Sequence, residues 1–125
     1  MWSVLQRTLR ESPDSRCAAH AGSEDLGPTP HDLYDSALGA CKALTTLWYA
    51  RRKQIPVDDI RVTVERDDSE ERRGTYRLRT TLHLTGPLTE AQRQELLAVA
   101  NKCPVHKLMT LATTEVQTEL APAVG

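Results

Sequence analysis

The sequence predicts a single α+β domain in which an antiparallel sheet covers one long helix. Three patterns indicate this class. Residues 29–54 have the periodicity of a helix that is apolar over most of its circumference, residues 60–84 alternate as a strand hairpin, and two shorter helical segments follow. Because 125 residues give room for one core, we expect residues 1–125 to form one domain.

The N-terminal part predicts an antiparallel pair of strands. The segments Trp2–Leu9 and Ser15–Ala21 flank residues 11–14, whose Glu-Ser-Pro-Asp composition is typical of a turn. Residues 22–28 then form a loop. Cys17 falls in the second strand, and we assign no chemistry to it.

A long central helix is predicted from Thr29 to about Gln54. Thr29 caps it, Pro30 occupies the first turn and Asp32 completes a capping box. Apolar residues form two rows on this helix, and the polar residues form a narrow stripe: Asp35, Lys42, Thr46 and Lys53. Gly39 costs about 1 kcal/mol relative to alanine inside a helix, which indicates close approach of another backbone, such as a helix of a second subunit.

The second half of the chain continues with strands and then helices. Residues 60–65 and 76–84 alternate between apolar and polar positions and predict a hairpin around the charged turn 67–74. A second capping box, residues 88–92, opens a helix that ends near Asn101.

The last two predicted elements are a short helix and a strand. The short helix runs from Cys103 and Pro104 to about Leu111, and residues 113–120 predict a final strand before a frayed tail.

Charge and composition indicate which binding partners and which cellular compartment to expect. A net charge of −1 gives no reason to expect nucleic acid or an anionic membrane surface as a partner. No signal peptide and no run of eighteen apolar residues is present, so we expect a cytoplasmic protein. The three cysteines are an odd number in a reducing compartment, so any disulfide is expected to be transient.

Two cysteines have sequence contexts that favour thiol chemistry. Pro104 prefers the first position of a helix, so Cys103 is a predicted N-cap whose sulfur faces unpaired amides, which favours a thiolate. Cys41 lies deep in the apolar run of residues 37–41. A buried thiol facing an activated thiol suggests redox work; the alternative is that both are small core residues. His106 is expected to be an exposed residue of the short helix.

Four motifs together resemble the OsmC/Ohr family of thiol-dependent hydroperoxide reductases, and most closely its broader OsmC-like branch. They are Gly27-Pro28-Thr29-Pro30-His31-Asp32-Leu33, Ala37-Leu38-Gly39-Ala40-Cys41, Tyr49-Ala50 with Lys53-Gln54-Ile55-Pro56, and Asn101-Lys102-Cys103-Pro104-Val105-His106-Lys107. The resemblance implies an intertwined homodimer with two sites at the subunit interface. It implies that Cys41 attacks a hydroperoxide, that Cys103 resolves the sulfenic acid to a disulfide, and that an external dithiol reduces the disulfide without a cofactor.

One position departs from the family pattern. In the peroxidases a glutamate after the proline that opens the central helix holds an arginine that ionises the attacking thiol; here His31 stands at that position. His31 is either a solvated residue of the first turn or a base or cation near Cys41. Asp32 is either the capping partner or the group that holds the arginine. The arginine comes from the N-terminal segment in the family, and Arg16 is favoured over Arg7 and Arg10.

Two other classes of function remain open. Cys41, Cys103, His31 and His106 have the ligand types of a zinc site, although none of them forms a closely spaced pair. Alternatively, the protein is a non-catalytic dimer that binds a hydrophobic ligand in a pocket around Cys41, Leu44 and Trp48, with the thiols incidental.

Overall fold

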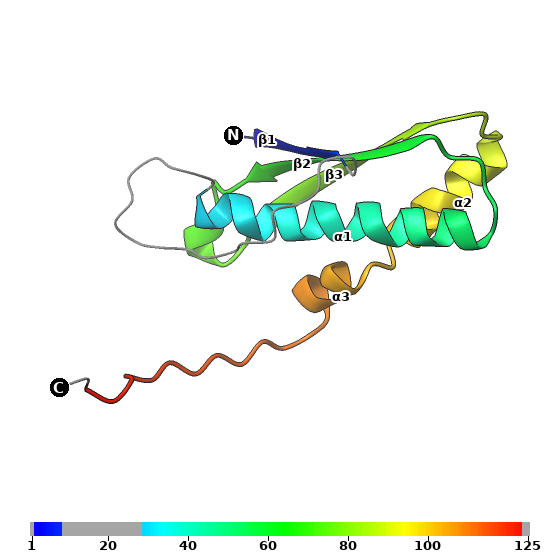
Figure 1. Cartoon of the computed structure of the whole chain (residues 1–125). Helices are drawn as coiled ribbons and strands as arrows, with labels where there is room; N and C mark the ends of the chain where they lie inside the picture. Colours follow the sequence, from blue (N-terminus) through cyan, green and yellow to red (C-terminus); the bar gives the residue numbers. More distant parts are fainter. Residues whose placement is uncertain (1, 9–28, 124–125) are drawn as a thin grey trace.

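A computed structural model describes residues 2–8 and 29–123, with side chains from residue 29 onward (Figure 1). In chain order its elements are β1 (Trp2–Thr8), α1 (Pro30–Arg52), β2 (Asp59–Asp67), the 3₁₀ turn η1 (Glu71–Arg73), β3 (Arg77–Thr85), α2 (Glu90–Ala100) and α3 (Pro104–Thr110). The strands form an antiparallel sheet in the order β1-β2-β3, and α1 lies along one face of it. The predicted α+β class is confirmed.

The hairpin of β2 and β3 is present, and the inward face of β2 is the predicted one. Ile60 pairs with Leu84 and Val62 with Leu82. The inward side chains of Ile60, Val62 and Val64 are at most 2% exposed. The first predicted strand is also present, as β1, and it pairs with β2. Its predicted partner, residues 15–21, lies outside the described residues, as do Cys17 and the loop 22–28.

Helix α1 begins at the predicted cap. Thr29 Oγ1 accepts a hydrogen bond from the Asp32 backbone N–H, and the Thr29 N–H donates to Asp32 Oδ2, both at 3.1 Å. The helix ends at Arg52, two residues before the expected end, because Gln54 has a left-handed backbone with φ 56°. Within the described residues no helix combines the length and apolar character needed to cross a membrane.

Three of the four residues of the polar stripe on α1 are buried: Asp35, Lys42 and Thr46. Small residues, among them Gly39 and Ala43, share this buried side. Three bulky residues of the apolar rows are instead exposed, with Tyr34 at 48%, Leu44 at 54% and Trp48 at 61%, whereas Leu38 is buried. The sheet therefore packs on the side of the helix where small side chains allow close approach.

Gly39 makes the close approach that its position in a helix predicts, but its neighbour is β2 of the same chain. A Cβ atom at Gly39 would lie 2.9 Å from Val64 Cγ2. The suggested neighbour, a helix of a second subunit, is therefore wrong for this side of the helix.

The C-terminal part agrees with the predicted helices and disagrees with the predicted final strand. Thr89 and Gln92 form the second capping box, and Leu96 and Ala100 of α2 are buried. Residues 112–120 form no strand, and Val116 and Leu120 are 79% and 99% exposed. Strand alternation is present there, but within the described chain no neighbouring strand supplies hydrogen bonds.

We expect Gly39→Ala to lower the free energy of unfolding by about 1–2 kcal/mol, because overpacking against Val64 exceeds the gain of about 1 kcal/mol in helix propensity. Chemical denaturation measures this change. In the Val64→Ala background the obstructing methyl group is gone, so the same substitution should raise the free energy of unfolding. An unchanged sign in the two backgrounds contradicts the prediction.

Candidate functional site

The structure brings the two predicted reactive cysteines together. Cys41 lies half-buried in the middle of α1, and Cys103 is the N-cap of α3 and is fully buried. Both thiols are free, and Cys41 lies near enough to Cys103 to raise the pKa of the Cys103 thiol. Residues distant in sequence thus form one thiol site where α3 packs against α1.

Cys103 has the predicted position at a helix start, but its predicted acidity is wrong. Its Sγ accepts a hydrogen bond from the backbone N–H of His106 at 3.3 Å. Burial nevertheless raises the pKa of the Cys103 thiol, and the His106 N–H and the nearby charge of Lys42 offset this only in part. Desolvation therefore outweighs the partial charge of the short α3 helix.

The main group that sequence reasoning missed is Lys42, which the helical pattern assigned only to the polar stripe. Its side chain is 3% exposed, and Nζ donates to the backbone carbonyl of Ala100 at 3.0 Å and to His106 Nδ1 at 2.9 Å. Burial lowers the pKa of Lys42, while the neighbouring Cys103 and Cys41 thiols raise it. Lys42 follows Cys41 directly on a helix that is otherwise largely apolar, and this position could have identified it as part of the site.

His106 is half-buried and takes part in the site, contrary to the expectation of an exposed helix residue. Because an ammonium group has donors only, Nδ1 of His106 accepts and its ring proton lies on Nε2, which makes the ring neutral. Burial and the charge of Lys42 both lower the pKa of His106. The ring also borders a cavity of about 750 Å³ between α1, β3 and α3.

Asp32 performs the capping role considered for it, and it also pairs with an arginine, although not with one of the candidates. Besides its capping bond, its Oδ1 lies 2.9 Å from Nη1 of Arg66, and the same nitrogen lies 2.9 Å from Oδ2 of the buried Asp35. Tyr76 donates its hydroxyl proton to Asp35 Oδ1 at 2.6 Å. The arginine held here is Arg66 of β2, which was not among the candidates.

Alternation in β2 contained the signal for Arg66. It lies two residues after Val64, on the face that also carries Ile60 and Val62, so its guanidinium group points toward α1 and needs a buried partner. Asp35, one of the stripe residues, provides that partner.

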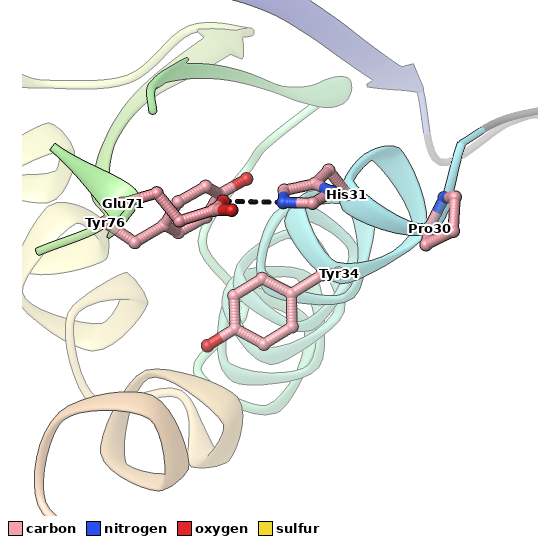
Figure 2. A pocket seen from close by; sticks show the side chains of 5 residues that line it. All are labelled: Pro30, His31, Tyr34, Glu71 and Tyr76. Atoms are coloured by element: carbon pink, nitrogen blue, oxygen red, sulfur yellow. Dashed lines mark hydrogen bonds and ion pairs between the residues drawn. The ribbon is translucent and has the colours of Figure 1, made fainter. Parts of the chain in front are cut away.

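His31 lies away from the thiols of its own chain. Its Nε2 is 2.6 Å from Glu71 Oε1, and Figure 2 shows these side chains facing each other beside Tyr76. The cavity there has a volume of about 310 Å³ and is lined by Pro30, His31, Tyr34, Glu71 and Tyr76. Ten residues of helix separate His31 from Cys41, about 15 Å along the axis.

The other predicted site residues have different outcomes. Arg16 lies outside the described residues, so its predicted role stays a prediction. The four suggested zinc ligands do not converge, because His31 bonds Glu71; among residues 2–8 and 29–123 no group of three or more His, Cys, Asp or Glu could hold a metal ion.

Comparison with known proteins gives a family and a fold. A family model described as "OsmC-like protein" matches residues 22–119. A crystal structure of an OsmC-like hydroperoxide resistance protein from Jannaschia sp. CCS1 has a TM-score of 0.57 and 18% sequence identity, covering 81% of this chain and 73% of that chain. At this identity the likeness shows the fold alone. Among curated proteins no sequence matches the chain.

We expect Asp35→Asn to lower the free energy of unfolding by about 3 kcal/mol, because it leaves the guanidinium group of Arg66 partly uncompensated beside the core. Tyr76→Phe, which removes only the hydroxyl donor to Asp35, should cost about 1 kcal/mol. Urea denaturation measures both. Glu70→Gln, in an exposed ion pair with Arg77, is the control and should change little; an Asp35→Asn effect no larger than this control would contradict the role of the cluster.

We expect the ring of His106 to titrate below its ordinary pKa of 6.5. Its depressed pKa means that, as the pH falls below 6.5, the unfolded chain takes up the proton first and the folded state loses stability. NMR titration of the ring protons measures the midpoint. His106→Asn should remove this part of the loss of stability, and a midpoint at or above the ordinary value would contradict the prediction.

Proposed function

The chain belongs to the OsmC-like protein family, and from this premise we propose that it reduces organic hydroperoxides with two cysteine thiols, in defence against oxidative stress. The observation that carries the proposal is the pair of free, neighbouring thiols of Cys41 and Cys103, which both lie near Lys42. The structural neighbour described as a hydroperoxide resistance protein supports it.

In the proposed reaction the Cys41 thiolate attacks the outer oxygen of the hydroperoxide. The O–O bond breaks, the alkoxide takes a proton and leaves as alcohol, and Cys41 becomes a sulfenic acid. The Cys103 thiol then forms a disulfide with Cys41 and water is released. An external dithiol reduces this disulfide. Because turnover requires that reduction, we propose the reducing cytoplasm as the compartment.

The assembly proposed for this reaction is an intertwined homodimer around α1 as a long central helix. Its support is the exposed apolar side of α1, where Leu44 and Trp48 are more than half exposed. Within one chain the start of α1 lies about 15 Å from Cys41. His31 and Asp32 can therefore serve a thiol site only if a partner subunit brings its Cys41 to them.

A positive charge from the N-terminal segment, with Arg16 as the candidate, stays part of the proposal. Asp32 already holds Arg66 in this structure, so any pairing with Arg16 would compete with that ion pair.

A second candidate function is the binding of a hydrophobic ligand without catalysis. The cavity beside Tyr34 and Tyr76 favours it, since two aromatic rings line a volume of about 310 Å³ (Figure 2). The suggested location around Leu44 and Trp48 is less suited, because both side chains lie on the surface and Trp48 packs under Arg52.

We expect one equivalent of an organic hydroperoxide to join Cys41 to Cys103 and to leave Cys17 reduced. Peptide mass mapping of the oxidised protein identifies the bond. Steady consumption of hydroperoxide with a dithiol should be lost in Cys41→Ser, and Cys103→Ser should stop at the sulfenic acid, which a dimedone probe traps. Absence of consumption by the unaltered protein would favour the ligand-binding function.

A further inference from the structure

The ammonium group of Lys42 is buried without a carboxylate partner in the described part of the chain. Burying a charge costs free energy unless the group is paired. Its two hydrogen-bond acceptors, the Ala100 carbonyl and His106 Nδ1, are both neutral. The groups near it that can carry negative charge are the thiols of Cys41 and Cys103.

His106 joins the lysine to the thiol pair. Its ring accepts from Lys42 Nζ at 2.9 Å, and its backbone N–H donates to Cys103 Sγ at 3.3 Å. Lys42 and Cys103 therefore contact the same residue, and Cys41 is the residue before Lys42 in α1. The ammonium group has three protons, and Ala100 and His106 accept two of them. The third proton is bonded to neither of these two acceptors.

We propose that the ammonium group of Lys42, held by the Ala100 carbonyl and the His106 ring, is the positive charge that stabilises the reactive thiolate of the Cys41–Cys103 pair. The proposal deepens the proposed thiol chemistry and rests on it. When a thiol of the pair loses its proton to solvent, the resulting thiolate faces this ammonium group and the buried charge gains its missing counterpart. The side chain of His106 is a positioning group, because it acts on the thiols through the place it gives to Lys42.

The surroundings of Lys42 strengthen such an ion pair. The small cavity beside Lys42 is lined otherwise by neutral side chains: Val62, Thr80, Leu82, Leu97, Ala100 and Asn101. In the described structure, the titratable groups that face Lys42 are thus Cys41 and Cys103 together with His106. A charge pair in such a neutral, partly buried setting is screened less by water than an exposed one.

The test measures thiol reactivity and needs no hydroperoxide. The full chain is alkylated with iodoacetamide across a range of pH, and peptide mass mapping gives the rate at each cysteine, with Cys17 as the internal reference. We expect Lys42→Met to lower the rate at the Cys41–Cys103 pair about tenfold at about pH 7 and to move its pH profile upward. Lys42→Arg keeps the charge and should retain most of the rate.

The His106 variants separate positioning from folding. His106→Leu removes the acceptor and should move the pH profile in the same direction by less, whereas His106→Asn keeps an acceptor and should move it less still. If Lys42→Met fails to fold, as circular dichroism would show, the two His106 variants carry the comparison. A merely structural role for Lys42 or His106 would change the unfolding midpoint without moving the pH profile.

The outcomes also distinguish this proposal from the proposed function. An unchanged profile in Lys42→Met overturns the role of the lysine, even if the unaltered protein reduces hydroperoxides. A shifted profile that Lys42→Arg restores supports the role, even if no hydroperoxide is consumed.

Discussion

The close contact between α1 and β2 is the constraint on which the rest of this structure depends. Gly39 has no side chain, so Val64 can approach the helix backbone to a distance that a methyl group would obstruct. This contact fixes which side of α1 faces the sheet. Asp35 and Lys42 lie on that side, one turn before Gly39 and one turn after it, and are buried as a result. The ion cluster with Arg66 and the thiol site both follow from this choice of face.

Local signals predicted the elements well because their physics is local. The capping boxes at Thr29 and Thr89 satisfy orphan amides within one turn, and the alternation from Ile60 to Val64 follows from strand geometry. The buried face of α1, in contrast, is determined by packing against the sheet and not by local sequence. Bulky apolar residues such as Trp48 indicate burial, but a single chain leaves them exposed and buries the side with small residues. The final strand failed for a similar reason, since alternation cannot supply a neighbour.

The sequence predicted the two cysteines of the candidate site but not the charged residues that surround them. Both cysteines could be identified from motifs, and the structure brings them together. The acidity expected for Cys103 relied on the helix start alone, whereas full burial acts in the opposite direction. Lys42 was missed because the polar stripe of a largely apolar helix was not considered as part of a buried site. Arg66 was missed because the last inward position of the strand was not considered.

The position of Gly39 has a consequence for how sequences of this kind can change. It lies within one helical turn of Cys41 and Lys42, so a shift of α1 against β2 at Gly39 would also move the lysine that bonds the Ala100 carbonyl. A substitution that repacks the core at Gly39 or Val64 would displace the charge beside the sulfur atoms. The effects of substitutions in this part of the core and of substitutions that change thiol reactivity would therefore not be additive.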